Sequence, residues 1–216
     1  MFLGENNMLQ KYPRTPHLPF SLSRTEDDKT LENCDNFIGK NVVVTIKMDG
    51  ENSTLYKDYS HARSLDSVHH VSRDWLKAFH STFKNDIPNG WRICGENVYA
   101  FHSILYENLE SYFYGFSIWT EENICLSWKE TLEWFSLFGI TPVKEIYSGI
   151  WNEKIIRNLS FENEEGFVVR NSESFSYDTF SENVAKCVRK NHVQTDKHWK
   201  DRPVIPNHLR KAPEEF

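Results

Sequence analysis

Residues 45–52 carry the stretch that decides the fold, Thr45-Ile46-Lys47-Met48-Asp49-Gly50-Glu51-Asn52. The β-branched run before Lys47, residues 42–46, predicts a buried strand. The Asp-Gly pair then predicts a turn, and residues 52–56 predict a returning strand. Such a hairpin would hold the lysine amine rigidly and let a ligand approach Gly50 closely.

Lys47 is the first candidate for chemistry. A partly buried lysine beside another cation loses some of its proton affinity and can act as a nucleophile. The alternative is a surface lysine on an ordinary hairpin, because Lys-x-Asp-Gly is a short pattern. The motifs that follow in the chain decide between these two interpretations.

Composition and length narrow the class of protein. The 216 residues suffice for one large domain or two small ones, and 39% hydrophobic content allows a sizeable core. The sequence has no secretory start and no apolar run long enough to span a membrane. We therefore expect a cytoplasmic protein without a membrane partner. The cysteines are far apart and predict reduced thiols rather than a disulfide framework or zinc site: Cys34, Cys94, Cys125 and Cys187.

Charge is distributed unevenly along the chain. The net charge is −6, yet the C-terminal end is basic. Its only acids after Lys186 and before residue 212 are Asp196 and Asp201. The bases there are Lys186, Arg189, Lys190, Lys197, Lys200, Arg202, Arg210 and Lys211. A basic tail over residues 191–216 suits a polyanion, and a solvated tail suits the charge pattern equally well.

The two ends of the chain frame several predicted elements. Residues 1–30 are expected to form an extended arm, because the prolines of residues 12–20 exclude a helix interior and Tyr12, Leu18 and Phe20 offer apolar anchors.

Ser72 is predicted to cap a helix that carries aromatic residues on one face. A capping box from Ser127 to Glu130 predicts a second helix.

Five further segments place polar or aromatic side chains where a nucleotide could meet them. Arg63 suits phosphate and ribose oxygens, because a guanidinium binds them bidentately. Glu96 lies next to a glycine at the end of the strand over 91–97. The strand over 111–119 is very aromatic, and one ring could stack on a base. Glu165 lies at the head of another strand, and Lys186 lies in the last one.

Taken in order, these motifs resemble the covalent nucleotidyltransferase superfamily of polynucleotide ligases and mRNA capping enzymes. The closest resemblance is to nick-sealing, RNA ligase 2-like ATP-dependent RNA ligases. It covers roughly residues 42–190 and depends on the order and spacing of the motifs.

The resemblance assigns roles at the first half of the site. The Lys-x-Asp-Gly nucleophile motif falls on Lys47, Asp49 and Gly50, and its Gly-x-Asn continuation falls on Asn52. An Arg-Ser element falls on Arg63. These residues are implied to bind the nucleotide.

The remaining motifs match less completely. The ribose-binding glutamate falls on Glu96, and the Phe-Asp-Ile strand falls on Phe116, with a serine replacing the acid. The Glu-Gly-x-Val element begins at Glu165. The final Lys-x-Lys element begins at Lys186, but a valine occupies its second lysine position, so Arg189 or its neighbour Lys190 is expected to replace that contact.

The resemblance also implies a reaction. Lys47 would attack the α-phosphorus of ATP and form a lysyl-AMP, which then passes to a 5′-phosphate end and is displaced by a 3′-hydroxyl. Glu165 would hold Mg²⁺ or Mn²⁺ through water, and Lys186 with that metal would disfavour the proton on Lys47. Glu96 would bind the ribose and Phe116 would stack on adenine. The implied partner is RNA with 5′-phosphate and 3′-hydroxyl ends, bound by a monomer.

The implied fold is α+β, with two packed antiparallel sheets, flanking helices and the AMP pocket between them. We expect a single nucleotidyltransferase domain over residues 1–216 without an OB-fold, because few residues follow Lys190, and a tail that grips nucleic acid through His198 and Trp199. Three alternatives remain: a GTP-dependent capping guanylyltransferase, a DNA ligase-like enzyme, and an inactive RNA-binding module. The absent OB-fold and the Gly-x-Asn sequence count against the first. The joint presence of Lys47, Glu96, Glu165 and Lys186 counts against the last.

Overall fold

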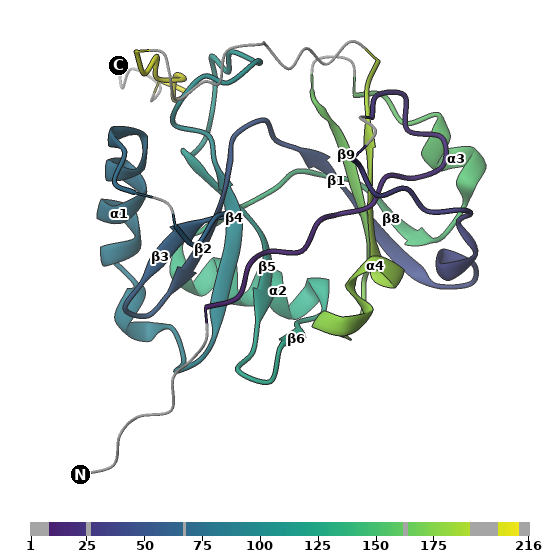
Figure 1. The fold of residues 1–216 in the computed structure, drawn as a ribbon, viewed down its shortest axis with the longest axis horizontal. Helices are drawn as coiled ribbons and strands as arrows, with labels where there is room; N and C mark the ends of the chain where they lie inside the picture. Colours follow the sequence, from purple (N-terminus) through teal and green to yellow (C-terminus); the bar gives the residue numbers. More distant parts are fainter. Residues whose placement is uncertain (1–8, 25–26, 67, 162–163, 191–202, 212–216) are drawn as a thin grey trace, which may run out of the picture.

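Two β-sheets side by side form the body of the protein, with helices at their outer faces (Figure 1). The computed structural model describes residues 9–24, 27–66, 68–161, 164–190 and 203–211. The predicted α+β class with two antiparallel sheets is confirmed, except that one short strand pairs in parallel.

The first sheet is built around strand β1 (Asn41–Lys47). Because β1 has neighbours on both sides, its β-branched residues are buried almost continuously, as the sequence predicted. The strand order is β11-β9-β1-β8, and all pairs are antiparallel. The other strands of this sheet are β8 (Glu145–Ile150), β9 (Gly166–Asn171) and β11 (Val184–Val188).

The second sheet has the order β10-β6-β5-β4-β2-β3, and β7 pairs in parallel with β5. A cluster of buried residues that includes Val43 and Ile46 from β1 and Tyr114 from β5 joins the two sheets. Its strands are β2 (Glu51–Tyr56), β3 (Ser60–Ala62), β4 (Arg92–Asn97), β5 (Phe113–Trp119), β6 (Ile124–Cys125), β7 (Thr141–Pro142) and β10 (Phe175–Ser176).

Helices cover the outer faces of both sheets. Phe135 of α2 and Leu76 of α1 pack on the second sheet, and Ile156 of α3 packs on the first. The α-helices are α1 (Asp74–Ser81), α2 (Trp128–Phe138), α3 (Glu153–Arg157) and α4 (Phe180–Asn183). The 3-10 helices are η1 (Asp35–Phe37), η2 (Val71–Arg73), η3 (Lys84–Asp86) and η4 (Tyr177–Thr179).

One helix start is confirmed and the other is corrected. The predicted capping box of Ser127 and Glu130 opens α2 with both reciprocal hydrogen bonds. Ser72, however, does not cap α1. It lies inside η2, where its backbone N–H donates to the ring of His70, and α1 begins two residues later.

The predicted hairpin at Lys47 is wrong. Strand β1 belongs to the first sheet and β2 to the second, so residues 48–50 carry the chain from one sheet to the other. The β1 strand pairs instead with β8 and β9, which come more than ninety residues later in the chain. Lys47 is therefore at the junction of the two sheets.

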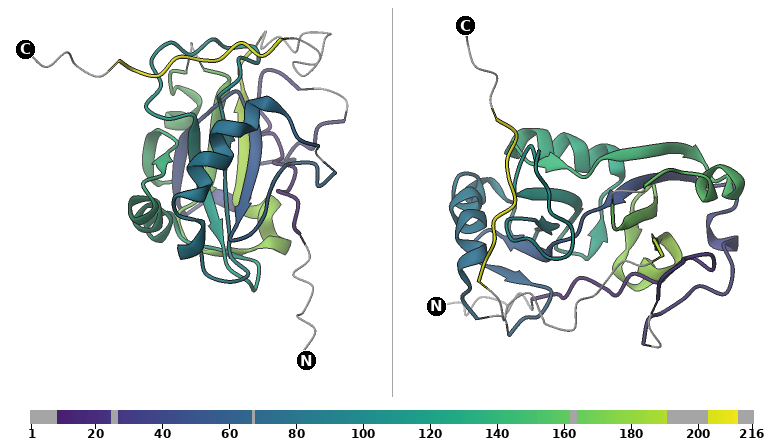
Figure 2. Two further views of the ribbon diagram at one scale, coloured as in Figure 1. Left: turned by 90° about the vertical axis from the view of Figure 1, so that its left-hand side faces the viewer. Right: turned by 90° about the horizontal axis from the view of Figure 1, so that it is seen from above.

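Residues 9–24 cross the molecule in front of both sheets (Figure 1). Lys186 of β11 donates its backbone N–H to Pro16 and accepts from Leu18, at 2.9 and 2.8 Å. Beside the second sheet, Tyr177 of η4 donates its hydroxyl to the carbonyl of Lys11. Figure 2 shows α2 on the opposite side of the molecule from this segment.

The four cysteines are buried and carry free thiols, as predicted. None of the helices that the structure describes combines the length and apolar character needed to span a bilayer.

Candidate active site at the junction of the sheets

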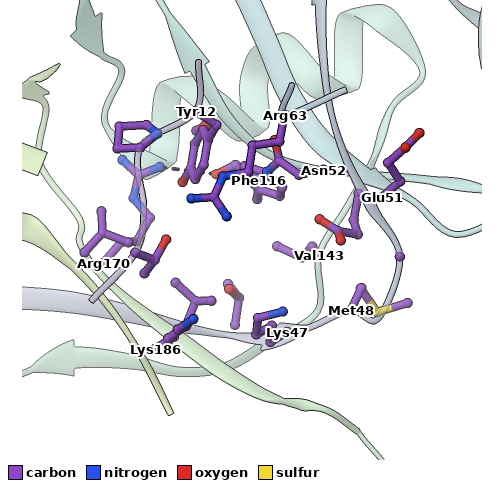
Figure 3. Close-up of a pocket in the computed structure, with 18 of the residues that line it drawn as sticks. Tyr12, Lys47, Met48, Glu51, Asn52, Arg63, Phe116, Val143, Arg170 and Lys186 are labelled. Atoms are coloured by element: carbon purple, nitrogen blue, oxygen red, sulfur yellow. Dashed lines mark hydrogen bonds between the residues drawn. The ribbon is translucent and has the colours of Figure 1, made fainter. Parts of the chain in front are cut away.

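A cavity of about 410 Å³ opens where the two sheets meet. Figure 3 shows its walls, with Lys47 and Lys186 from the first sheet and Asn52 and Phe116 from the second. The structure brings seven of the predicted site residues to this cavity: Lys47, Gly50, Asn52, Arg63, Glu96, Phe116 and Lys186.

Lys47 lies at the last position of β1, opposite Gly166 of β9. Its Nζ donates a hydrogen bond to Oε2 of Glu165 at 2.5 Å. The side chains are 25% and 12% exposed, respectively, so this ion pair is largely shielded from water. Glu165 thus acts directly on the amine although it does not line the cavity itself.

The charge state of Lys47 differs from the expectation. Burial lowers the pKa of Lys47, but the negative charges of Glu165, Glu96 and Asp49 outweigh burial, so its pKa lies above the ordinary 10.5. In this ligand-free state the amine is a cation and not a nucleophile. A ligand that engages the carboxylates must therefore remove the excess proton affinity.

The environment of Glu96 favours its neutral form, whereas that of Lys47 favours its charged form. It lies on β4 between Asn52 of β2 and Tyr114 of β5. Burial raises the pKa of Glu96 to about 8, and the charge of Lys47 only partly opposes that rise. Near neutral pH this carboxyl is therefore mostly protonated, and it can donate as well as accept a hydrogen bond.

Lys186 lies on β11 and lines the same side of the cavity as Lys47 (Figure 3). Burial lowers the pKa of Lys186, Asp28 opposes that effect, and the charge of Lys47 adds to it. The ammonium is 3.6 Å from Oδ1 of Asp28. Lys186, rather than Lys47, is therefore the lysine with weakened proton affinity.

Two glycines bring strands close together around the site. A Cβ at Gly50 would lie 2.5 Å from the carbonyl oxygen of Asn97, and one at Gly166 would lie 2.0 Å from that of Cys187. No larger residue fits at either place. Gly50 was predicted to admit a ligand closely. It lines the cavity, and it also lies against the protein's own backbone.

Two acids near Lys47 have structural partners. Oδ2 of Asp49 accepts hydrogen bonds from the backbone N–H groups of Ser103 and Ile104, both at 2.8 Å, and Asp49 does not line the cavity. Glu51 accepts two hydrogen bonds from the guanidinium of Arg73, at 2.5 and 2.6 Å. These acids hold loops and strands in place beside the site.

The last motif is only partly at the cavity. Arg189 does not line it: its backbone N–H donates to the carbonyl of Glu165, and its charge acts on Glu164. Lys190 is exposed just after β11. The predicted contacts of Lys197, His198, Trp199, Lys200 and Arg202 lie outside the described residues.

The structure also adds residues that the motifs did not single out. Tyr12 packs edge-on against Phe116 with ring centroids 5.0 Å apart, and it lines the cavity. Arg170 is only 5% exposed and also lines the cavity, while donating to the carbonyl of Leu126. Tyr12 could have been found from its place as an apolar anchor in the proline-rich segment. No sequence signal pointed to Arg170.

The cavity fits a nucleotide. Oδ1 of Asn52 is buried there without a hydrogen-bond partner among the described residues, which is costly unless a ligand supplies a donor. Phe116 offers a ring face with Val143 and Val168 in the same cavity.

The donor set also fits a divalent metal that is shared with phosphate. The described residues contain no group of three or more acids, histidines or cysteines that could hold a metal alone. Glu165 supplies one carboxylate beside the cavity, and Mg²⁺ often binds through one or two carboxylates plus phosphates and water.

The site therefore combines a lysine at the junction of two sheets, a carboxylate bonded to it, and a cavity that a second lysine also lines. The RNA ligase family model matches residues 40–188, and the chain belongs to that family. No curated protein matches the chain in sequence.

Solved RNA ligases share the fold at low sequence identity. An archaeal ATP-dependent RNA ligase has a TM-score of 0.57 and 16% identity, covering 83% of this chain and 48% of that one. A Naegleria gruberi RNA ligase mutant with ATP and Mn has a TM-score of 0.55 and 17% identity, covering 87% and 58%. A second mutant of that ligase, with AMP and Mn, has a TM-score of 0.53 and 15% identity, covering 86% and 57%. This chain therefore spans about half the length of the ligases it matches.

Proposed function

We propose that this protein is an ATP-dependent RNA ligase that works through a covalent lysyl-AMP on Lys47. The observation that carries the proposal is the ion pair of Lys47 and Glu165 beside a cavity that also holds Glu96, Phe116 and Lys186. Membership of the RNA ligase family supports the same reaction.

In the first step the Lys47 amine attacks the α-phosphorus of ATP. The N–P bond forms, the bond from that phosphorus to the bridging oxygen breaks, and pyrophosphate leaves with the electron pair. The amine must first lose a proton, which the carboxylates now hold in place. Glu165 and Glu96 would give up that stabilisation on turning to a metal and to ribose hydroxyls, so the pKa of Lys47 would fall and its proton would pass to water.

The other residues of the cavity recognise parts of the nucleotide. Glu96 hydrogen-bonds ribose hydroxyls, and Phe116 stacks on adenine. Asn52 and Arg63 contact sugar and phosphate oxygens, and Lys186 stabilises the negative charge that develops at phosphorus. Glu165 would hold Mg²⁺ or Mn²⁺ through water, and that ion would supply further charge stabilisation when bound.

The later steps use RNA. A 5′-phosphate oxygen attacks the lysyl-AMP, which frees Lys47, and a 3′-hydroxyl then attacks the adenylylated end and releases AMP. We infer that the basic residues after β11 hold the strand by its phosphates. We further propose that one nucleotidyltransferase domain acts as a monomer in the cytoplasm.

Covalent labelling tests the proposal directly. Purified protein is incubated separately with ATP and GTP radiolabelled at the α-phosphate, with Mg²⁺ or Mn²⁺, and resolved on a denaturing gel. We expect label from ATP only, followed by sealing of a nicked, 5′-phosphorylated RNA duplex. Labelling by GTP instead indicates a capping-type enzyme, sealing of a DNA nick in preference to RNA indicates a DNA ligase-like enzyme, and no labelling leaves an RNA-binding module.

A further inference from the structure

A second, smaller cavity of about 230 Å³ adjoins the first at Lys186. It shares Thr15, Arg63 and Lys186 with the larger cavity, so a ligand in one lies next to a ligand in the other. The remaining charged residues come from before residue 40, where the family match begins: Arg14, Asp27, Asp28 and Lys29.

The backbone around this cavity is fixed on two sides. His17 donates its N–H to the carbonyl of Lys29 and accepts from Leu31, at 2.7 and 2.9 Å. The same residue pairs as an isolated parallel bridge with Lys186 of β11. Residues 14–18 and 29–31 are thus tied to the strand that carries Lys186, and this places Arg14 and Lys29 beside it.

Basic side chains outnumber acidic side chains in this cavity. Asp28 lies 3.6 Å from Lys186, which offsets one cation. Within the described part of the chain, Arg14, Lys29 and Arg63 have no carboxylate within 4 Å, whereas the cavity holds only one further acid, Asp27. Arg14 repels Arg63, while the charges of Glu96 and Asp28 attract it. The unpaired cations therefore make a positive potential that an anion would relieve.

We propose that Arg14, Lys29, Arg63 and Lys186 form a phosphate-binding subsite next to the Lys47 cavity. Guanidinium and ammonium groups that converge on a small polar cavity suit phosphate oxygens, which accept several charge-assisted hydrogen bonds at once. The segment before residue 40 is thereby part of the active site. This inference rests on the proposed ligase function for its place in the reaction.

Two phosphates could enter this subsite during ligation. One is the pyrophosphate portion of ATP, and the other is the 5′-phosphate of the RNA strand. The chemistry of recognition is the same, so the choice is made by experiment.

The test measures binding rather than catalysis. In a Lys47→Ala background, where pyrophosphate can bind but not react, calorimetry is used with three ligands: inorganic pyrophosphate, a 5′-phosphorylated oligoribonucleotide and its 5′-hydroxyl counterpart. The variants are Arg14→Gln with Lys29→Gln, and Asp27→Asn. Lys129→Gln is the matched control, because it removes one charge from an exposed position of α2. Arg14, Asp27 and Lys29 are also exposed, so these changes leave the fold intact.

We expect the double variant to weaken binding of one phosphate ligand about tenfold or more. Asp27→Asn removes a repelling charge, so it tightens the same ligand several-fold, and Lys129→Gln changes neither. An effect on pyrophosphate assigns the subsite to the nucleotide, whereas an effect on the 5′-phosphorylated strand alone assigns it to RNA. Unchanged binding of both, or weaker binding in Asp27→Asn, overturns the subsite. Absence of AMP labelling in the wild-type protein would instead count against the ligase function and leave these binding results valid.

Discussion

Two neighbouring groups of residues, at the main cavity and at the smaller cavity that adjoins it, have opposite electrostatic character. At the carboxylate end, defined here by Lys47, Glu96 and Glu165, the acids outweigh burial and raise the pKa of the lysine. At the basic end, defined by Lys186, Arg63, Arg14 and Lys29, burial prevails and the pKa of Lys186 falls. Both lysines are on the first sheet, so neighbouring charges and not the strands make the difference.

This difference suggests a division of labour. In the proposed reaction, the carboxylate end would keep the amine of Lys47 protonated until its acids engage a nucleotide and a metal. The basic end is ready for phosphates without any change of protonation. The predictions below alter one end at a time, and they run from the largest expected effect to the smallest.

The largest effect is expected at the nucleophile. Lys47→Ala removes the amine that donates to Glu165, and we expect AMP labelling to fall below detection. Lys47→Arg keeps the charge and the partner but lacks a nucleophilic nitrogen, so it should fail equally while keeping thermal stability near that of the wild type. Denaturing gels measure the labelling of both variants, and thermal unfolding measures their stability. A labelled Lys47→Ala protein would place the nucleophile elsewhere.

The next effect concerns the acid bonded to that amine. Glu165→Gln loses the charge that we propose holds the metal, so we expect the labelling rate to fall about a hundredfold, within the range for lost transition-state stabilisation. It also removes a charge that raises the pKa of Lys47, so the pH of half-maximal labelling should move down.

Glu164→Gln is the matched control for that variant. Glu164 is the preceding residue, and the charges that act on it are those of Lys144 and Arg189 rather than Lys47. If the pH of half-maximal labelling rises in Glu165→Gln, or equals that of Glu164→Gln, then Glu165 does not raise the pKa of the Lys47 amine.

Much of the fold could be predicted from local patterns. The run before Lys47 is β-branched and buried, and the box at Ser127 is a short-range signal, so both elements were predicted correctly. The hairpin was not, because β1 finds its partners in β8 and β9, and pairing over such a separation leaves no local pattern. Asp-Gly indicated a turn, but the same two residues also suit a crossing between sheets.

The site shows the same limit. The order and spacing of the motifs predicted that Lys47, Glu96 and Lys186 share one site, and the structure places them around one cavity. Asp49 differs, since its oxygen is held by backbone donors fifty residues later, which no motif reports. The raised pKa of Lys47 depends on three carboxylates from separate segments, and only their arrangement in space reveals it.

The third prediction alters the basic end. Lys186→Gln should slow labelling about tenfold to a hundredfold, because it removes a charge that stabilises the transition state. The repulsion between the two lysines is mutual, so its loss raises the pKa of Lys47. The labelling profile should therefore move to higher pH, opposite to that of Glu165→Gln. Lys129→Gln, an exposed change on α2, serves as the control. If the pH of half-maximal labelling shifts in the same direction in Lys186→Gln and Glu165→Gln, the proposed electrostatic difference between the two ends is wrong.

The smallest effect is a stability difference at Glu96. Burial raises its pKa from 4.5 to about 8, so the folded state binds this proton more tightly than the unfolded chain does. Stability is therefore lost as the pH rises from the unfolded value towards the folded one, and it levels off above that. Glu96→Gln lacks this group, so its advantage over the wild type should grow by at least about 1 kcal/mol across that interval.

Urea unfolding of the ligand-free proteins at several pH values across that interval measures the difference. Glu107→Gln, at an exposed position of the second sheet's connecting loop, is the control and should follow the wild type throughout. The amine of Lys47 does not titrate in this range, because its pKa lies above 10.5, so the slope belongs to Glu96. Parallel curves for Glu96→Gln and the wild type would mean that Glu96 is already ionised beside Lys47. The carboxylate end would then hold a full extra negative charge before any nucleotide arrives, and its contrast with the basic end would be sharper than proposed.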